Sequence, residues 1–218
     1  MRLSAIVPTL NAEAHLPSCL AALAAADEIL VVDGGSHDAT RKIAQSAGAQ
    51  LIESPPGRGI QLAAGAAAAT GDWLLFVHAD TRLAPGWRGA AESHARAWPG
   101  AAAAFRFTLD DDAPQARVIE AGARLRGRLG LPYGDQGLLI SRSLYDALGG
   151  FRPLALMEDV DLARRLGRRR LMVLPCPAIT SAERWRRDGW FARSTRNLFC
   201  LAAWSVGVDQ DRLAGFYR

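Results

Sequence analysis

The stretch Trp73-Leu74-Leu75-Phe76-Val77-His78-Ala79-Asp80 decides the expected fold. Its first five residues are apolar without alternation, which is typical of a strand buried on both faces of a sheet. The apolar run stops at His78, so polar side chains follow where the strand leaves the core. In open α/β sheets, ligands bind beyond the carboxyl ends of the strands. Asp80 can therefore hold a divalent metal or a sugar hydroxyl, or it can simply cap the turn before Leu83.

Two earlier segments end in the same way. A first strand is predicted over residues 3–7 and leads into Pro8-Thr9-Leu10-Asn11, and a second over residues 29–32 leads into Asp33-Gly34-Gly35-Ser36. Each turn alone fits an ordinary connection between a strand and a helix. Three polar strand ends in one sheet are much less expected by chance, so together they favour a ligand-binding crevice.

Helices are expected to follow these turns. Asn11 is a good N-cap for an Ala- and Leu-rich helix that extends to about residue 25, and Ser36 can cap the next helix. Arg58 lies between two glycines at the start of an Ala-rich helix over residues 60–69. A guanidinium and a helix N-terminus both favour anions, so this position suits a diphosphate.

Strand and helix alternate up to about residue 80, with a short strand over residues 50–53 included. This order predicts a right-handed parallel α/β layer. The GxGxxG fingerprint is absent, which counts against a domain that binds nicotinamide dinucleotides.

The second half of the chain is less regular. We predict a strand over residues 101–109, a helix over residues 117–129, and a polar turn, Gly134-Asp135-Gln136, ahead of another strand. A further helix begins near Glu158 with three carboxylates in its first turn. Acidic residues stabilise the N-terminus of any helix by about 0.3–1 kcal/mol each, so stabilisation alone is a sufficient reason for these carboxylates.

Composition narrows the class of protein. The 218 residues, half of them apolar, suffice for one large domain or two small ones. Residues 1–110 carry 8 Lys or Arg against 10 Asp or Glu, and residues 111–218 carry 18 against 12. The basic second half indicates an anionic partner: a nucleotide diphosphate, a nucleic acid or a membrane surface. Three cysteines without a CxxC pair, and no signal-peptide pattern, lead us to expect a cytoplasmic protein.

The motifs together resemble those of the family-2 glycosyltransferases, in the order in which that family carries them. They are Pro8-Thr9-Leu10-Asn11, Val31-Val32-Asp33-Gly34-Gly35-Ser36-His37-Asp38, Arg58-Gly59, Ala69-Thr70-Gly71-Asp72, Phe76-Val77-His78-Ala79-Asp80 and Glu158-Asp159-Val160-Asp161-Leu162. The resemblance covers roughly residues 3–170. The tail, with its Arg184-Trp185-Arg186-Arg187 segment, resembles a small bacterial branch encoded near radical-enzyme and selenium-related proteins.

The resemblance implies the GT-A fold, an α/β domain with a mostly parallel central sheet flanked by helices, here followed by a helical C-terminal tail. It also implies a single domain over residues 1–218. Residues 1–100 would bind the nucleotide sugar, and residues 101–218 would form the acceptor side. The implied reaction moves a sugar from a nucleotide-diphosphosugar to an acceptor, with inversion at the anomeric carbon and with Mn²⁺ or Mg²⁺ as cofactor.

The resemblance also assigns roles to residues. Asp80 would be the direct metal ligand, and Asp159 would be the general base. The donor side would be Pro8, Thr9, Asn11, Asp33, Arg58 and His78. The acceptor side would be Gly134, Asp135, Gln136 and Glu158. Of the three carboxylates at the start of one helix, Asp161 is expected to support the helix, because successive helical positions point about 100° apart.

Three departures from the family pattern bear on these roles. The usual Asp-Asp-Gly-Ser reads Asp33-Gly34-Gly35-Ser36, and the usual Asp-x-Asp reads His78-Ala79-Asp80. The Gln-x-x-Arg-Trp of processive synthases reads Ser181-Ala182-Glu183-Arg184-Trp185, so polymer synthesis is not expected. Two alternatives stay open: a non-catalytic protein that binds nucleotide sugars, and a sugar-1-phosphate nucleotidyltransferase, whose Gly-rich signature after the first strand is missing.

The tail contains a segment over residues 197–206 that is apolar nearly all round and too short to span a membrane. Five arginines precede or begin it: Arg184, Arg186, Arg187, Arg193 and Arg196. This segment is expected to be either a core helix or a dimer interface, or else a peripheral contact with anionic lipid that reaches a lipid-linked acceptor. A nucleic-acid partner is not expected.

Overall fold

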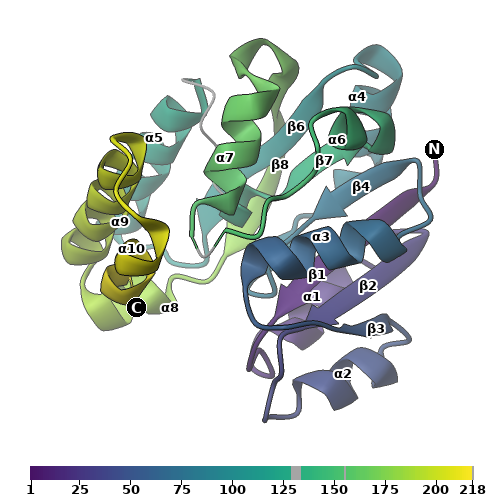
Figure 1. Cartoon of the computed structure of the whole chain (residues 1–218), viewed down its shortest axis with the longest axis horizontal. Coiled ribbons are helices and arrows are strands. Elements are labelled where there is room, and N and C mark those ends of the chain that lie inside the picture. The colour runs from purple at the N-terminus through teal and green to yellow at the C-terminus, as the bar shows by residue number, and fades with distance from the viewer. Residues whose placement is uncertain (129–133, 155, 218) are drawn as a thin grey trace.

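The computed structural model of the protein describes residues 1–128, 134–154 and 156–217. Its centre is an eight-stranded mixed sheet in the order β3-β2-β1-β4-β7-β6-β8-β5 (Figure 1). The strands are β1 Leu3–Thr9, β2 Glu28–Asp33, β3 Gln50–Glu53, β4 Trp73–Phe76, β5 Thr81–Leu83, β6 Ala102–Leu109, β7 Leu138–Ser141 and β8 Leu171–Thr180.

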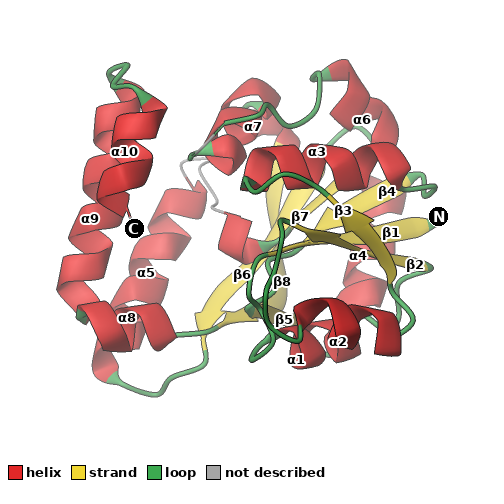
Figure 2. Ribbon diagram, turned by 60° about the horizontal axis from the view of Figure 1, so that its bottom comes forward, coloured by secondary structure: helices red, strands yellow, loops and turns green. Residues whose placement is uncertain are grey.

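Helices cover both faces of this sheet (Figure 2). The α-helices are α1 Leu16–Ala22, α2 Thr40–Ser46, α3 Arg58–Ala68, α4 Trp87–Ala97, α5 Pro114–Arg128, α6 Arg142–Ala147, α7 Glu158–Leu166, α8 Glu183–Asp188, α9 Trp190–Ser205 and α10 Gln210–Tyr217. Two short 3₁₀ helices are η1 Gly134–Gln136 and η2 Arg168–Arg170. The last residue of the helix predicted over 117–129 lies outside the described residues.

Strand β4 is buried on both faces, as its unbroken apolar run predicts. Leu75 packs into the core beneath α1, α2 and α4, whereas Leu74 and Phe76 pack into the core beneath α3, α6 and α7. All four residues of β4 are buried. Alternate side chains thus stabilise opposite layers, and the strand ends where His78 and Asp80 leave the core.

The predicted parallel layer is confirmed for the first half of the chain. β1 pairs in parallel with β2 and β4, and β2 pairs in parallel with β3. The direction changes at β4, which pairs antiparallel with β7. Because β1, β2 and β4 run the same way, their carboxyl ends meet at one edge of the sheet.

The predicted start of the first helix at Asn11 is wrong. Asn11 has a left-handed backbone, φ 51°, and its side-chain oxygen accepts a hydrogen bond from the backbone N–H of His37 at 2.9 Å. Helix α1 begins instead at Leu16, with Pro17 in its first turn, where the missing N–H of proline costs no helical hydrogen bond. Asn11 therefore joins the loop after β1 to the loop after β2.

Ser36 is likewise not a helix cap. Helix α2 begins at Thr40 after Ala39, and the Ser36 hydroxyl donates a hydrogen bond to Asp33 Oδ1 at 2.5 Å. The backbone N–H of Asn11 donates to the same hydroxyl at 2.8 Å. The serine stabilises the turn rather than the helix that follows it.

The C-terminal part of the chain forms a separate layer of helices beside the end of the sheet. Helices α5, α8, α9 and α10 gather there in both views, with α9 and α10 away from the strands (Figures 1 and 2). None of the helices in the described part combines the length and the apolar character that crossing a bilayer requires.

Candidate active site

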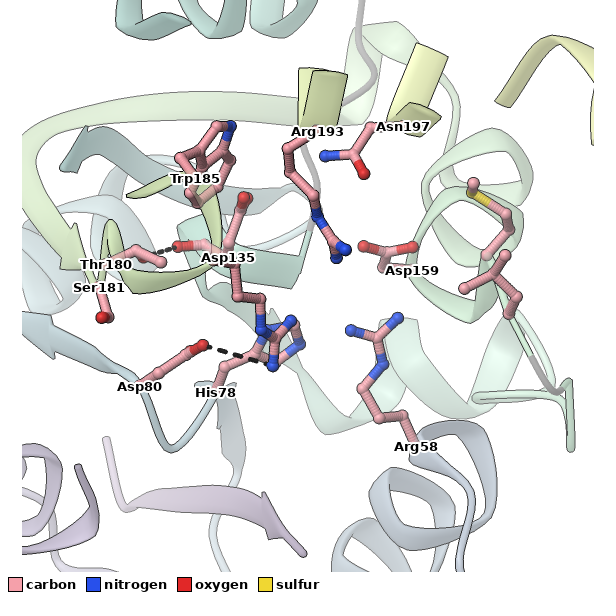
Figure 3. A pocket seen from close by; sticks show the side chains of 13 residues that line it. Arg58, His78, Asp80, Asp135, Asp159, Thr180, Ser181, Trp185, Arg193 and Asn197 are labelled. Atoms are coloured by element: carbon pink, nitrogen blue, oxygen red, sulfur yellow. Dashed lines mark hydrogen bonds and ion pairs between the residues drawn. The ribbon is translucent and has the colours of Figure 1, made fainter. Parts of the chain in front are cut away.

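A pocket of about 630 Å³, counting the space open to solvent, lies at the carboxyl end of β4. Its walls come from both halves of the chain (Figure 3). The residues that line it are Arg58, His78, Asp80, Asp135, Leu156, Met157, Asp159, Thr180, Ser181, Arg184, Trp185, Arg193 and Asn197. Five of the predicted site residues are therefore brought together: Arg58, His78, Asp80, Asp135 and Asp159.

Asp80 lies on the turn between β4 and β5, and its carboxylate faces the pocket. Its Oδ1 is buried and accepts no hydrogen bond from the residues that the structure describes, while Oδ2 lies 3.7 Å from Nη2 of Arg184. The backbone carbonyl of Asp80 accepts a hydrogen bond from the N–H of Ser181 at 3.0 Å, which ties the turn to the end of β8. A buried carboxylate oxygen without a donor is poorly solvated and favours a cation beside it.

His78 lies half-buried next to Asp80. Burial, and then the charge of Arg58, lower the pKa of the imidazole to about 4, although the carboxylates of Asp80 and Asp159 oppose this. His78 is therefore neutral at pH 7 and adds no positive charge to the pocket. Its backbone carbonyl accepts a hydrogen bond from Cys19 Sγ at 3.5 Å. Burial raises the pKa of that thiol, and the charge of Asp80 raises it further, so Cys19 stays protonated as a donor.

Arg58 and Glu158 form an ion pair that joins α3 to α7. Nε of Arg58 lies 2.7 Å from Oε1 of Glu158, and the glutamate side chain is fully buried. The contact joins a fully buried carboxylate to a guanidinium that is 31% exposed. Burial raises the pKa of Glu158, and the nearby Arg58 opposes that rise. Glu158, assigned from sequence to the acceptor side, lies outside the pocket lining.

Asp159 enters the pocket from the first turn of α7. In Figure 3 its carboxylate lies between the side chains of Arg193 and Arg58. One of its oxygens accepts a hydrogen bond from the N–H of Val160 at 2.8 Å. The three carboxylates of this turn point to different surroundings, as the helical rotation of about 100° per residue requires.

Asp161, the third carboxylate, points away to the body of the protein. Its oxygens lie 2.6 Å from Nη2 of Arg165 and 3.1 Å from Nη1 of Arg152. Arg165 in turn donates to the backbone carbonyls of Leu148 and Gly150 at 2.5 and 2.7 Å. Asp161 thus stabilises the packing of α7 on the turn after α6.

We predict that Asp161→Asn lowers the free energy of unfolding by about 1–3 kcal/mol, because it weakens two charge-assisted contacts in a mostly buried position. Urea unfolding followed by circular dichroism measures this. Nucleotide affinity should stay at the wild-type value. A variant with unchanged stability but weakened nucleotide binding would contradict the structural role.

The residues assigned from sequence to the nucleotide form a second group, at the ends of β1 and β2. Thr9 and Asp33 are register partners, and Thr9 Oγ1 donates to Asp33 Oδ1 at 3.1 Å. Burial alone would raise the pKa of Asp33, but hydrogen bonds from Ser36, Thr9 and Gly35 outweigh it and lower that pKa. Pro8 is buried within β1, and Asn11 is exposed. None of these four assigned residues lines the pocket around Asp80.

The side chains of η1 lie in two different places, one in the pocket and one in the protein interior. Asp135 lines the pocket, and its backbone carbonyl accepts a hydrogen bond from Oγ1 of Thr180 at 2.9 Å. Gln136 is buried away from the pocket and donates from Nε2 to the carbonyl of Phe105 at 3.0 Å. Gly134 is the first residue of η1.

Sequence reasoning gave no site role to the C-terminal wall of the pocket. Trp185 comes from α8, and Arg193 and Asn197 come from α9. The Arg193 side chain is 4% exposed and lies 3.2 Å from Asp188 Oδ2. The sequence pointed to this wall only through the Arg184-Trp185 pair. It did not point to Arg193 or Asn197, because an apolar helix does not indicate which of its polar residues faces a pocket.

The pocket has features that fit a divalent cation held jointly with a ligand. Among the described residues, no group of three or more His, Cys, Asp and Glu side chains could hold a metal alone. Asp80 nevertheless presents an unpartnered buried oxygen. Mg²⁺ is commonly bound through one or two carboxylates together with substrate phosphates and water. The donor set therefore fits a cation that arrives with a diphosphate.

Comparisons with known proteins match parts of this chain. The model of the family described as "Glycosyl transferase family 2" matches residues 4–145. An uncharacterized glycosyltransferase of Mycobacterium tuberculosis is 40% identical over 82 residues, which is 37% of this chain and 38% of the relative. A PGL/p-HBAD biosynthesis glycosyltransferase of the same species is 41% identical over 91 residues, 37% of this chain and 36% of the relative. The matched segments span less than half of the length of either relative.

Solved structures share the fold. Glucosyl-3-phosphoglycerate synthase from Mycobacterium tuberculosis, in a complex with Mn²⁺, UDP and glucosyl-3-phosphoglycerate, has a TM-score of 0.59 at 23% identity, with 80% of this chain and 70% of that chain covered. Residues 1–349 of S. aureus TarS have a TM-score of 0.63 at 18% identity, with 100% of this chain and 69% of that chain covered.

Proposed function

This chain belongs to glycosyl transferase family 2, and we propose that it transfers a sugar from a nucleotide-diphosphosugar to an acceptor hydroxyl, with inversion and with a divalent cation. The observation that carries this proposal is the meeting of Asp80 and Asp159 in one pocket, each from a different element. An unpartnered carboxylate oxygen supports cation binding, and a second carboxylate supports proton transfer.

An inverting transfer is a single in-line displacement. The acceptor oxygen attacks the anomeric carbon while the bond from that carbon to the diphosphate oxygen breaks, and the acceptor proton passes to Asp159. A divalent cation bound at Asp80 would neutralise charge on the departing diphosphate. Arg58, at the N-terminus of α3, is placed to stabilise the same charge.

The C-terminal wall supports binding of the acceptor on the side of Asp159. Trp185 and Arg193 line the pocket from α8 and α9, and Asp135 lines it from η1. Tryptophan offers a flat apolar surface, and the polar groups around it can bind hydroxyls. Such a wall suits a sugar-like or otherwise polyhydroxylated acceptor.

The test is the release of free nucleoside diphosphate from UDP- and GDP-sugars, with Mn²⁺ or Mg²⁺ and with a panel of acceptors. Turnover that depends on both donor and metal supports the transferase. Tight nucleotide binding with no release under any condition would favour the non-catalytic alternative. Formation of nucleotide sugar from a sugar 1-phosphate and a nucleoside triphosphate would favour the nucleotidyltransferase.

We predict that Asp80→Ala weakens binding of UDP or GDP in Mn²⁺ by about 10²-fold, to the affinity that wild type shows in EDTA, because both changes remove the same cation contact. Isothermal titration calorimetry measures the affinities. Asp72→Ala is the matched control, since Asp72 is an exposed carboxylate at the opposite end of β4. Mn²⁺ alone should bind weakly, because Asp80 supplies too few ligands. An Asp80→Ala variant that binds UDP and GDP in Mn²⁺ as tightly as wild type would contradict the metal role.

A further inference from the structure

Most of the large apolar side chains that are exposed in the described residues belong to one layer of the fold. Of the twelve large apolar residues exposed in the described part, eight belong to the C-terminal helical layer. They are Val118 and Leu125 of α5, Phe191, Leu198 and Phe199 of α9, Val206 and Val208 of the following loop, and Phe216 of α10. Such a concentration marks an interaction surface rather than scattered exposure.

The spacing of these residues places them on continuous stripes. Phe191, Leu198 and Ala202 are exposed at positions i, i+7 and i+11 of α9 and so share one face of the helix, which we call the outer face of α9. On α5, Val118 and Leu125 are seven residues apart and both exposed. Helix α5 packs against α9, and α9 lies away from the sheet in both views.

The charge of this layer determines which partner fits. Over residues 114–128 and 183–217, which contain the helices of this layer, the sequence carries ten arginines against five acidic residues. Arg193 and Arg196 contact Asp188, so the net charge of the layer counts here rather than each arginine. A second copy of the chain docked face to face would bring two arginine-rich surfaces together, which is electrostatically unfavourable. An anionic partner is favoured instead. Aromatic and leucine side chains on one face of a helix, together with a net positive charge around it, are typical of helices that lie in the interface of an anionic membrane.

The opposite face of α9 lines the pocket. Arg193 and Asn197 are four residues apart on α9 and both reach the pocket, and Cys200 is fully buried below them. Helix α9 therefore separates the pocket from the apolar surface by roughly its own diameter of about 10 Å. A molecule anchored in a membrane under the outer face would have a short path to the pocket.

We propose that the outer face of α9 docks on an anionic lipid surface. Resting on the proposed function, we further propose that this docking presents a lipid-anchored acceptor to the pocket. The apolar stripe supplies the contact with the acyl boundary, and the net positive charge of the layer supplies the attraction to lipid headgroups. The docking itself requires neither the donor nor the metal.

Flotation of the full-length chain with vesicles tests the docking. Vesicles of phosphatidylcholine alone are compared with vesicles containing one-third phosphatidylglycerol, at low salt and at high salt. We expect binding only to the anionic vesicles, weakened by about tenfold or more at high salt, because surface charge is screened. The double variant Phe191→Ser/Leu198→Ser should also lose about tenfold or more in affinity, because it removes two exposed apolar contacts.

Trp98→Ser is the matched control, since Trp98 is a large exposed side chain at the C-terminal end of α4. Helix α4 lies away from the C-terminal layer (Figure 1). The Trp98→Ser variant should bind vesicles as wild type does. Circular dichroism melting of each variant shows whether the fold persists; all these side chains are exposed, so Tm should change little. Donor hydrolysis in the absence of vesicles should be equal in wild type and the double variant, because neither Phe191 nor Leu198 lines the pocket.

Three outcomes would overturn the proposal. One is no flotation with anionic vesicles at low salt. Another is flotation that Phe191→Ser/Leu198→Ser leaves unchanged. The third is a dimer, detected by analytical ultracentrifugation, that the same variant dissociates while no vesicle binding is seen. Vesicle binding without any turnover would leave the docking standing and would count against the proposed function instead.

Discussion

Replacing Asp159 by asparagine is expected to lower turnover by about 10²–10⁴-fold while nucleotide affinity stays nearly unchanged. Removing a positioned general base typically costs a factor of this size. Asp159 is the carboxylate of the α7 N-terminus that reaches the pocket, and asparagine keeps its shape but cannot take a proton. Initial rates of nucleoside diphosphate release, with UDP affinity from calorimetry, measure the two quantities separately.

The two neighbouring carboxylates provide the controls. Asp161→Asn removes a carboxylate from the same helical turn, but its partners are Arg152 and Arg165, so turnover of the folded variant should be close to wild type. Glu158→Gln acts on a residue that lies outside the pocket lining. If Asp159→Asn keeps most of the activity while Glu158→Gln abolishes it, the base has been assigned to the wrong carboxylate.

The parallel half of the fold could be predicted because its signal is local. The apolar run at 73–77 marks a strand covered on both faces, and Leu74 and Leu75 indeed pack into opposite cores. Strands β5 and β8 were not predicted. β8 contains Pro175 and Pro177 and has a mixed burial pattern, and its pairing with β6 shifts register at a bulge after Phe105. Prolines in a strand are tolerated at such irregularities, which only the three-dimensional pairing reveals.

Helix boundaries were predicted less well where side chains have two uses. Asn11 and Ser36 are good caps by residue type, yet both are used to join the loops after β1 and β2. The polar side chains of asparagine and serine compete for turns as readily as for helix ends. The sequence alone does not show whether Asn11 and Ser36 bond to a helix end or to the other loop, because the hydrogen bonds between the loops join residues 25 and 26 positions apart.

The residues of the candidate site also differ in whether the sequence could predict their positions. Asp80 and Arg58 could be placed from the pattern of strands and helices, because Asp80 follows β4 and Arg58 begins α3. Asp159 was assigned through the family resemblance alone. Arg193 and Asn197 could not be found in this way, since their approach to the pocket depends on how α9 packs against the rest of the protein. Asp33, assigned to the nucleotide, already accepts four hydrogen bonds from Thr9, Gly35 and Ser36. A nucleotide group would have to compete with those donors.

Replacing Arg58 by methionine is expected to lower the free energy of unfolding at neutral pH by an amount near the lower end of about 3–5 kcal/mol, the usual cost of leaving one charge of a buried pair uncompensated. The lower end applies because the arginine side chain is itself 31% exposed, although Glu158 is fully buried. Urea unfolding at several pH values measures the loss. Methionine keeps the unbranched stem, so the change isolates the charge.

The loss of stability caused by Arg58→Met should depend on pH through the ionisation of Glu158. Burial raises the pKa of Glu158 in the folded state, so its contribution to stability is present below its unfolded pKa of about 4.3 and is lost as pH rises through the folded value. Arg58 opposes that rise, and without it the folded pKa moves higher. The difference in stability between wild type and Arg58→Met should therefore be small below the unfolded pKa of about 4.3, where the carboxyl is protonated in both variants, and should grow as the pH rises toward neutral.

A second substitution tests the cause. Adding Glu158→Gln to Arg58→Met removes the buried charge and should restore part of the stability at neutral pH, which a loss of packing alone would not allow. Arg184→Met is the control, because Arg184 is half exposed and lies 3.7 Å from Asp80, so its removal should cost less than about 1 kcal/mol. A stability loss that is equal at every pH, and that Glu158→Gln leaves unchanged, would show that the stem of Arg58 stabilises α3 against α7 and that its charge does not.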